Sequence, residues 1–310
     1  MRLAITGQQD FGKAVLEAFL ARGDEVAGVF CAPEKPGARP DALKVAAQEK
    51  GVRVFQFASL KSDEAKQALR GLGAEVGIMA FVLQFAPQDF VTIPTHGTIQ
   101  YHPSLLPKYR GPSSINWPIA RGETQTGLTI FRPTDGLDEG PVVLQKTTPI
   151  GPDDTLGTVY FERLFPMGVQ AMLEAADLVV AGKQRETVQD ESQATYEGWF
   201  RKAEARIHWA SHADHVYNII RGSNPAPGAW TTLDGRELQI FDARKIPVRT
   251  FGAVRGKIGE IVEAAGSAFQ VTAQGGRIEV LRAKLADGKK VAAAELIASG
   301  SIKAGQVLGA

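Results

Sequence analysis

Residues 2–30 read RLAITGQQDFGKAVLEAFLARGDEVAGVF, and this stretch decides the fold class. Apolar residues run together over 2–5 and 25–30, which predicts two buried strands, whereas those over 11–22 recur at helical spacing. Strands that alternate with helices pair in parallel and carry helices on both faces of the sheet. We therefore expect an α/β protein with a doubly wound, mostly parallel sheet.

The same alternation continues to about residue 180. Further strands are predicted at 52–55, 76–81 and 98–101, with helices at 40–49 and 63–72. Two later strands, near 128–131 and 142–146, are expected to extend the sheet edge in antiparallel fashion. A long helix over 156–180, which ends before Gly182, should pack across the sheet and complete a catalytic domain of residues 1–183.

A second, smaller domain is expected beyond a polar connection. Residues 184–203 lose all periodicity and read as a surface linker. In the domain that follows, residues 204–310, a helix at 213–221 precedes short strands separated by Gly, Asp and Pro. These strands are predicted at 229–233, 237–242, 256–263, 268–273 and 277–285. Short, closely spaced strands favour a small open β-barrel.

Composition excludes several classes of protein. The 35 basic residues nearly cancel the 34 acidic ones, so no global basic field attracts nucleic acid. The single cysteine, Cys31, excludes an intrachain disulfide and a cysteine-based zinc cluster. No apolar run is long enough for a signal peptide or a membrane span, and we expect a cytoplasmic protein that binds no membrane.

Residues 100–111, QYHPSLLPKYRG, carry the candidate chemistry. They follow a predicted strand and therefore open at the carboxyl edge of the sheet, where α/β proteins bind their ligands. Pro103 and Pro107 restrict the backbone, so the loop after His102 should be stiff, as a preorganised site requires. His102 is the candidate acid–base group.

A second turn, residues 135–141, reads DGLDEGP and places Asp138 between glycines. A carboxylate beside an imidazole selects its tautomer and stabilises its protonated form, which suits proton transfer near neutral pH. His102 and Asp138 are thus predicted to act as a pair, although spacing alone does not show that they meet.

These two motifs, HPSLLPxxRG over 102–111 and GLDxGP with its aspartate 36 positions after the histidine, resemble the 10-formyltetrahydrofolate-dependent formyltransferases and hydrolases. The likeness extends along the chain and is strongest to the N-terminal hydrolase domain of the 10-formyltetrahydrofolate dehydrogenases. Ile115–Trp117, Phe165–Pro166 and Pro227–Trp230 match its landmarks. Methionyl-tRNA formyltransferases are similar in layout and carry the same small β-barrel.

The resemblance implies a reaction and a formyl donor, 10-formyltetrahydrofolate, without a metal or a nicotinamide cofactor. A water or amine acceptor attacks the formyl carbon on N10 of the folate. His102 stabilises or protonates the tetrahedral intermediate, and Asp138 handles the protons. Donors aimed at such an oxyanion are worth about 2–4 kcal/mol each.

The resemblance also assigns binding residues. Pterin recognition falls on the backbone near Asp138 and on one apolar loop: Phe81, Val82, Leu83, Gln84 and Phe85. Acceptor contact or positioning of the catalytic loop falls on Ser104, Arg110 and Gly111. Arg110 suits either an anionic ligand or an internal tie, and the sequence leaves both open.

Gln100 departs from the pattern of amine formyltransferases. Those enzymes carry asparagine two residues before the histidine as a second oxyanion donor, whereas the dehydrogenase hydrolase domain lacks it. The extra methylene of Gln100 moves its amide by about a bond length, more than the ~0.5 Å that catalytic donors tolerate. Hydrolysis, or closely related formyl transfer, is therefore the leading prediction.

Two alternatives remain open. One is formyl transfer to an amine, on methionyl-tRNA or an amino sugar nucleotide, although the proline-rich segment 32–40 is too weakly basic to indicate tRNA binding. The other is a folate-binding regulator without turnover, against which the intact His102 and Asp138 argue.

Weaker motifs point elsewhere. Gly7 and Gly12 flank a strand-to-helix turn where an anion could rest, yet neither the dinucleotide nor the triphosphate motif is complete. A cluster of His208, His212, His215 and Asp214 at helical spacing favours exposed or capping residues over a metal site. Ser104 lacks the Gly-x-Ser-x-Gly elbow of a serine hydrolase.

Overall fold

The computed structural model describes residues 1–248, 252 and 254–309, which form two compact units. The first consists of Met1–Gly111, Gly127–Thr148 and Arg163–Tyr196, and the second of Pro112–Thr126, Pro149–Glu162 and Glu197–Ala310. The second unit thus includes two segments that the sequence places in the catalytic domain. The domain boundaries at residues 183 and 204 remain predictions.

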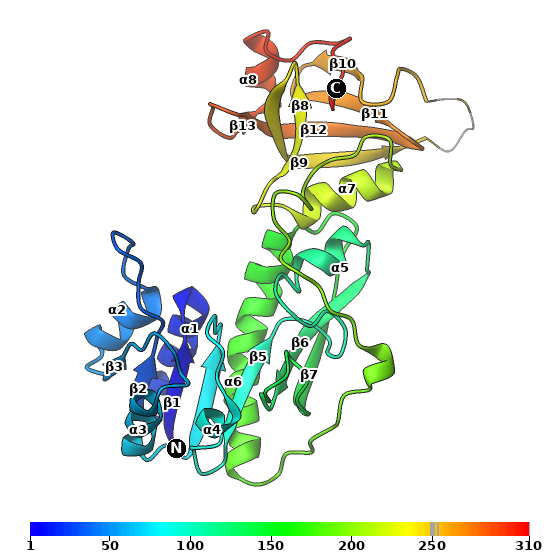
Figure 1. Cartoon of the computed structure of the whole chain (residues 1–310). Coiled ribbons are helices and arrows are strands. Elements are labelled where there is room, and N and C mark those ends of the chain that lie inside the picture. Colours follow the sequence, from blue (N-terminus) through cyan, green and yellow to red (C-terminus); the bar gives the residue numbers. More distant parts are fainter. Residues whose placement is uncertain (249–251, 253, 310) are drawn as a thin grey trace. The chain divides into compact units, whose positions relative to one another are not determined.

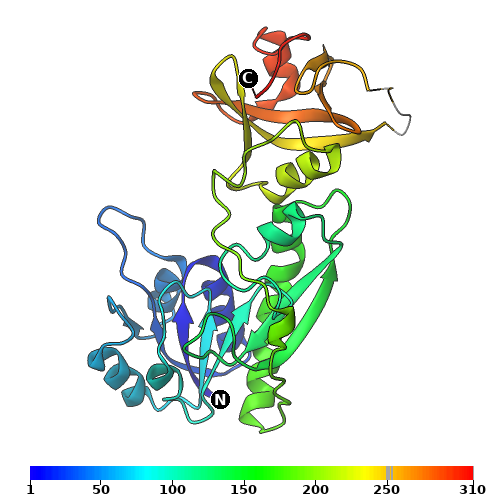
Figure 2. The ribbon, with the colours of Figure 1, turned by 45° about the vertical axis from the view of Figure 1, so that its right-hand side comes forward.

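A mixed sheet of seven strands, in the order β3-β2-β1-β4-β5-β6-β7, organises the N-terminal part of the chain (Figures 1 and 2). Its strands are β1 (Arg2–Gly7), β2 (Glu25–Phe30), β3 (Val54–Phe55), β4 (Val76–Ala80), β5 (Thr98–His102), β6 (Gln125–Phe131) and β7 (Val142–Pro149). The strands β3, β2, β1, β4 and β5 pair in parallel, and β6 pairs antiparallel with β5. The predicted mostly parallel sheet with an antiparallel addition is confirmed.

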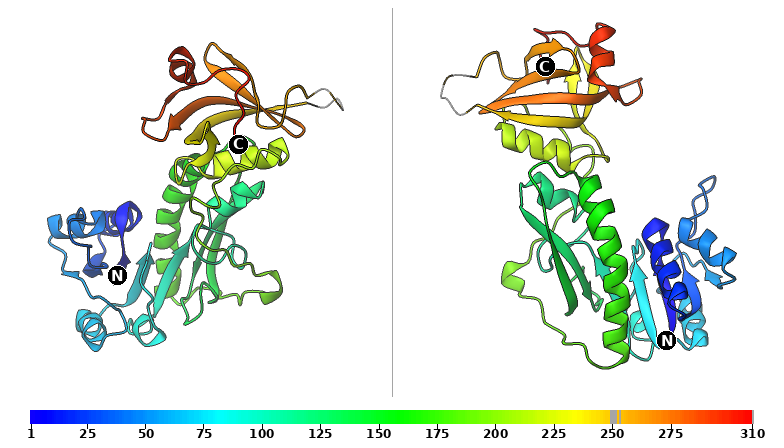
Figure 3. Two further views of the ribbon diagram at one scale, coloured as in Figure 1. Left: turned by 45° about the horizontal axis from the view of Figure 1, so that its top comes forward. Right: turned by 180° about the vertical axis from the view of Figure 1, so that it is seen from behind.

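Helices cover both faces of this sheet, as predicted for a doubly wound fold. They are α1 (Gln9–Ala21), α2 (Ala42–Glu49), α3 (Asp63–Leu72), α4 (Gln88–Val91) and α6 (Phe165–Val180). One face, with Ala4 and Met79, shares an apolar cluster with α3 and α4. On the other, α1 and α6 lie side by side (Figure 3, right), and Phe11 of α1 stacks on Tyr101 of β5 at 4.2 Å between ring centroids. No helix in the described part of the chain is long and apolar enough to cross a membrane.

The predicted long helix over 156–180 is interrupted. Residues Thr158–Leu164 form a π-helix, η1, before α6 begins at Phe165. Pro166 lies in the first turn of α6, and a proline inside a helix removes one backbone donor and collides with the carbonyl four residues earlier. The wider turns of the preceding π-helix relieve that collision. The spacing of apolar residues in the sequence does not predict such a change of helix type.

The second unit contains an antiparallel sheet in the order β10-β11-β12-β9-β8, with β13 beside β12. Its elements are β8 (Ala229–Leu233), β9 (Arg236–Pro247), β10 (Ile261–Ala265), β11 (Ala268–Ala273), β12 (Gly276–Leu285), β13 (Val291–Ala292), α5 (Asn116–Ala120), α7 (Ala213–Gly222) and α8 (Ala293–Ala298). Val307 and Leu308 bridge to Glu260 and Leu233, which links the two edges of the sheet. The smaller β domain is confirmed, and α7 packs against it (Figure 1).

Several details of the second domain differ from prediction. Strand β9 continues to Pro247, five residues beyond the predicted end at 242. The strand expected at 256–263 begins only at Ile261, because Gly256 and Gly259 have φ of 89° and 81°, a left-handed conformation that breaks a strand. The short elements β13 and α8 were not predicted, since two strand residues and six helical ones leave no periodic pattern.

Candidate active site

His102 is the last residue of β5, so its side chain projects at the carboxyl edge of the parallel strands. The ring is buried, and its Nε2 lies 2.8 Å from the carbonyl oxygen of Tyr109. Because a carbonyl only accepts, Nε2 carries the hydrogen. The neutral ring therefore keeps its lone pair on Nδ1, the nitrogen that is free for proton transfer.

Asp138 faces this free nitrogen. It lies in the loop between β6 and β7, and its Oδ2 is 3.5 Å from Nδ1 of His102. The same oxygen accepts a hydrogen bond of 2.9 Å from the backbone N–H of Gly111. Tertiary structure thus brings together the two residues that the sequence paired, with the carboxylate anchored and aimed at the nitrogen that would gain a proton.

Close backbone approaches define the loop that carries Asp138. The N–H of Arg132 donates to the carbonyl of Pro141 at 2.9 Å and closes the loop. A Cβ on Gly140 would lie 1.6 Å from the carbonyl oxygen of Arg132, so only glycine fits there. Asp138 has φ of 56°, a conformation that aspartate tolerates better than most residues. The glycines of this motif therefore serve the turn that presents the carboxylate.

Gln100 shares a face of β5 with His102, because alternate residues of a strand point the same way. Tyr101, between them, packs on the opposite face against Phe11. Gln100 is half-buried, and no residue in the described part of the chain hydrogen-bonds its side-chain amide. The Gln100 amide therefore lies on the face of β5 that carries His102, and its role in the reaction remains a prediction.

The loop that follows β4 reaches the same edge as His102. Met79 of β4 pairs in parallel with Gln100 of β5. Phe81 follows Met79 by two residues, and His102 follows Gln100 by two residues, so Phe81 and His102 are at corresponding positions. Phe81 has φ of 60°, which turns the chain sharply at this point.

The residues predicted to bind the pterin differ in exposure. Val82 is partly buried against the apolar cluster below α3 and α4, and the Gln84 side chain donates to the carbonyl of Phe57 at 2.8 Å. These two contacts fix the loop. The remaining three side chains are apolar and exposed: Phe81 (39%), Leu83 (56%) and Phe85 (49%). Such exposed apolar groups beside a catalytic edge favour an aromatic ligand.

Arg110 is bound by the protein itself. Its side chain is fully buried, and its Nε and Nη2 donate to Oε1 of Gln189 at 3.1 and 2.8 Å. Nη1 and Nη2 also donate to the two carboxylate oxygens of Glu191 at 2.9 and 2.6 Å. Of the two readings open for Arg110, the geometry fits the internal tie. Ser104 is likewise buried, with its hydroxyl donating to the carbonyl of Lys108 at 2.7 Å.

The segment predicted as a linker contacts this catalytic loop. Backbone N–H groups of Arg110 and Tyr109 donate to the carbonyl and hydroxyl oxygens of Thr195, at 2.9 and 2.7 Å. Thr187 and Val142 exchange two backbone hydrogen bonds. Residues 184–196 therefore line the first unit rather than crossing free surface. Sequence reasoning missed this role because polar, aperiodic residues do not report which partners they reach.

The chain matches the family described as Formyl transferase over residues 1–176 and the family described as Formyl transferase, C-terminal domain, over residues 200–300. It belongs to the formyl transferase family. The predicted family is thus confirmed, and the chain is an enzyme of that family.

Relatives of this chain include two kinds of protein. It is 41% identical over 246 residues to the mitochondrial 10-formyltetrahydrofolate dehydrogenase of Mus musculus; the match covers 78% of this chain and 26% of that protein. The chain thus spans about a quarter of that relative. It is 32% identical over 314 residues to the methionyl-tRNA formyltransferase of Geotalea uraniireducens, covering 100% of this chain and 98% of the relative.

A solved structure shares the fold. HypX from Aquifex aeolicus in complex with tetrahydrofolic acid superposes with a TM-score of 0.68 at 19% identity, covering 96% of this chain and 47% of HypX. At this level of identity the likeness supports the fold alone.

A carboxylate of the chain itself, Asp41, binds the turn after β1. Both oxygens of Asp41 accept from the N–H of Gln9 at 3.0 Å, in the first turn of α1. A Cβ on Gly7 would lie 2.2 Å from the carbonyl oxygen of Ala80. The glycine therefore allows β1 and β4 to approach, and the turn gives no support for a phosphate site.

One member of the histidine cluster, His212, caps a helix. Nδ1 of His212 accepts from the N–H of Asp214 at 3.2 Å and caps α7. Asp214 also pairs with Lys245. Within residues 1–248, 252 and 254–309, no group of three or more His, Cys, Asp or Glu side chains is arranged to hold a metal ion.

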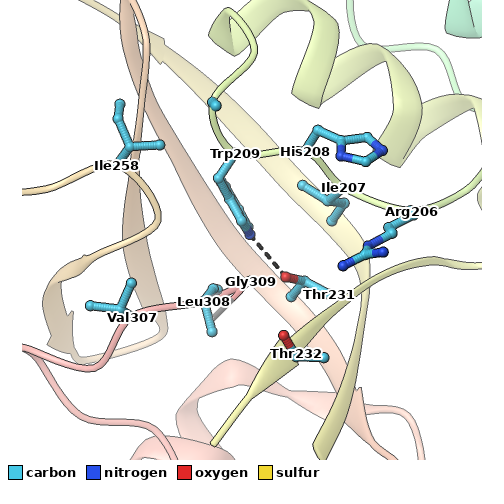
Figure 4. Close-up of a pocket in the computed structure, with 11 residues that line it drawn as sticks. Arg206, Ile207, His208, Trp209, Thr231, Thr232, Ile258, Val307, Leu308 and Gly309 are labelled. Carbon is cyan, nitrogen blue, oxygen red and sulfur yellow. Dashed lines mark hydrogen bonds between the residues drawn. The ribbon is translucent and has the colours of Figure 1, made fainter. Parts of the chain in front are cut away.

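The second unit has a cavity of about 340 Å³ that Figure 4 shows in close-up. Trp209 is one of the residues that line it, and its Nε1 donates to the hydroxyl of Thr231 at 3.0 Å. Apolar side chains of Ile207, Ile258 and Leu308 supply much of the wall. Of the described residues that line it, none carries a carboxylate, so this cavity offers no counterpart to the His102–Asp138 pair.

Glu191 makes the Arg110 network dependent on pH. The hydrogen bond from Arg110 lowers the pKa of Glu191 below its ordinary value of 4.5. A lowered pKa in the folded state stabilises the fold above the ordinary value, and that stabilisation is lost as the pH falls through the lowered pKa. We expect Glu191→Gln to reduce the melting temperature at pH 7, and the difference from wild type to shrink toward pH 3.5. Melting curves across this range test it; a difference independent of pH would contradict it.

Proposed function

We propose that this enzyme removes the formyl group from N10 of 10-formyltetrahydrofolate and passes it to water. The observation that carries the proposal is the approach of His102 Nδ1 to Asp138 Oδ2, 3.5 Å apart at the carboxyl edge of the sheet. The names of its relatives, a 10-formyltetrahydrofolate dehydrogenase and a methionyl-tRNA formyltransferase, support formyl chemistry on a folate.

The pair accounts for the proton movements of hydrolysis. Water attacks the formyl carbon, a C–O bond forms, and the carbonyl oxygen becomes an oxyanion. The C–N10 bond then breaks, and N10 takes one proton while formate and a second proton are released. Protonated His102 can give its Nδ1 hydrogen to the intermediate, and Asp138, as a carboxylate, stabilises the imidazolium and accepts a proton from water.

The exposed loop after β4 supports binding of the folate. Phe81, Leu83 and Phe85 offer apolar surface to the flat pterin, whose burial gains free energy in proportion to the area covered. The structural relative HypX has been crystallised with tetrahydrofolic acid, in agreement with this ligand class.

Gln100 is proposed to bias the reaction toward water. Its amide lies on the face of His102, but asparagine there would hold the donor about one bond length closer to the strand. We expect Gln100→Asn to raise the ratio of amine formylation to hydrolysis by about 10-fold, since one oxyanion donor has effects of this order or larger. Gln239→Asn is the matched control, since Gln239 is likewise a half-buried glutamine on a strand, β9. An unchanged ratio with every acceptor would remove Gln100 from the proposal.

Transfer to methionyl-tRNA is the second candidate. The observation that favours it is the alignment with the Geotalea uraniireducens methionyl-tRNA formyltransferase, which covers all of this chain and 98% of that protein. An affinity for tRNA that weakens steeply with salt would support it.

The deciding experiment incubates the protein with 10-formyltetrahydrofolate alone, and then with methionyl-tRNA or an amino sugar nucleotide, while tetrahydrofolate formation is followed. Turnover without acceptor supports hydrolysis. Turnover that requires one acceptor replaces hydrolysis with transfer to that acceptor, and folate binding without turnover under all three conditions would indicate a regulator.

A further inference from the structure

Gln189 connects the two loops that carry the catalytic pair. Its Nε2 donates to the carbonyl oxygens of Asp138 and Gly140, at 2.8 and 2.7 Å. Its Oε1 accepts from Nε and Nη2 of Arg110, at 3.1 and 2.8 Å. An amide side chain has two hydrogens and one oxygen with two lone pairs. Both hydrogens bind carbonyls of the loop that carries Asp138, and both lone pairs accept from Arg110 in the loop that follows His102.

Burial makes these bonds consequential. Gln189 is 6% exposed and Arg110 is fully buried, so water cannot replace a lost partner easily. A buried polar group left without a partner is costly, which favours a single arrangement of both loops. Gln189 lies in the stretch that sequence analysis predicts to be a free linker.

The backbone beside Arg110 sets the state of both catalytic residues. The carbonyl of Tyr109, one residue before, accepts from Nε2 of His102. The N–H of Gly111, one residue after, donates to Oδ2 of Asp138. Holding Arg110 therefore holds the group that selects the imidazole tautomer and the group that anchors the carboxylate.

The other end of the bridge holds a strained backbone. Asp138 has φ of 56°, in the left-handed region that non-glycine residues avoid unless their surroundings enforce it. The Gln189 amide binds the carbonyls on both sides of this turn, at Asp138 itself and at Gly140. These bonds orient the peptide units that flank Asp138 and so direct its side chain.

We propose that Gln189 is a positioning residue that keeps His102 in its Nε2–H tautomer and Asp138 within reach of Nδ1. The link to catalytic rate rests on the proposed function, whereas the tautomer does not. Gln189 itself contacts neither reacting side chain directly and acts through the backbone of the two loops.

The test compares three full-length variants. Gln189→Met removes all four bonds, and Gln189→Glu keeps the acceptor toward Arg110 but places an oxygen against two carbonyls. Asn224→Leu is the control, because the Asn224 amide is also buried and also donates twice, to the carbonyl of Phe241 and to a carboxylate oxygen of Asp242, neither of which belongs to the two bridged loops.

Both Gln189 variants should lose kcat about 10²-fold, the effect expected when reacting groups shift by about 1 Å. KM should change less than kcat, since the apolar loop 81–85 is untouched and only the other part of the predicted pterin site, the backbone near Asp138, loses contacts. Asn224→Leu should keep kcat within about 3-fold of wild type even if its melting temperature falls equally. A kcat for Gln189→Met equal to that of the control, or a fully active Gln189→Glu, would overturn the proposal.

A spectroscopic readout separates this proposal from the function on which it rests. In ¹⁵N-histidine-labelled protein, with His102 signals assigned by their loss in His102→Ala, the neutral wild-type ring should be protonated at Nε2 only. Gln189→Met should show a mixture of both tautomers. An unmixed Nε2–H tautomer in that variant would refute the positioning role. If the wild-type protein showed no turnover in the absence of an acceptor, the proposed hydrolysis would fail, while this measurement would still decide the role of Gln189.

Discussion

Replacing His102 with alanine should lower kcat by about 10³-fold, in the range lost with a general acid–base group. The reason is geometric: Nε2 is committed to the carbonyl of Tyr109, so Nδ1 is the ring nitrogen that can serve the reaction, and alanine removes it. Initial rates of tetrahydrofolate formation at saturating 10-formyltetrahydrofolate measure the loss.

The control for this prediction is His96→Ala. His96 lies just before β5, at the amino end of the strand, whereas His102 lies at its carboxyl end. The control should keep kcat within about 3-fold of wild type. Binding of tetrahydrofolate, followed by protein fluorescence, should survive in both variants. Retained turnover in His102→Ala would place the chemistry elsewhere.

Asp138→Asn should lower kcat by about 10²–10³-fold while the loop keeps its shape. Asparagine retains an oxygen to accept from the N–H of Gly111, and it tolerates a left-handed backbone as aspartate does. What it loses is the negative charge that stabilises protonated His102 at 3.5 Å. The variant therefore tests charge separately from structure.

The matched control is Asp135→Asn in the same loop. Oδ1 of Asp135 accepts from the N–H of Gln88 at 3.0 Å and is not among the contacts of His102. Rates and melting curves are measured for both variants. We expect equal melting temperatures and a large loss of kcat in Asp138→Asn only. Similar losses in both variants would mean that the loop, and not the carboxylate beside His102, sets the rate.

Much of the fold was predictable because it is encoded locally. Runs of apolar residues such as 25–30 became a strand with the predicted bounds, and α3 begins and ends where periodicity places it, at Asp63 and Leu72. The failures were also local in origin. A π-helix precedes Pro166 where the apolar pattern predicts a continuous α-helix. Because Gly256 and Gly259 have positive φ, β10 begins later than predicted.

The candidate site was predictable only in part. Sequence indicated His102 and Asp138 because each stands at a loop that ends or joins predicted strands, whereas the apolar loop after β4 was assigned by the family resemblance. It left open whether Arg110 binds a ligand or the chain. Gln189 could not be found, since a glutamine in a polar stretch has no pattern that marks it as buried.

What the sequence alone determined is the alternation of strands and helices, the family motifs and the residue types available for acid–base chemistry. What only the tertiary structure decided is which of those residues meet. His102 and Asp138 lie close together although they are 36 residues apart in the sequence. Arg110 and Gln189 are hydrogen-bonded although they are 79 residues apart. Periodicity reports only neighbours within a few residues, whereas these contacts depend on how β5, β6 and the segment 184–196 converge at one edge of the sheet. Direction and burial of each side chain, and so its chemistry, follow from that convergence.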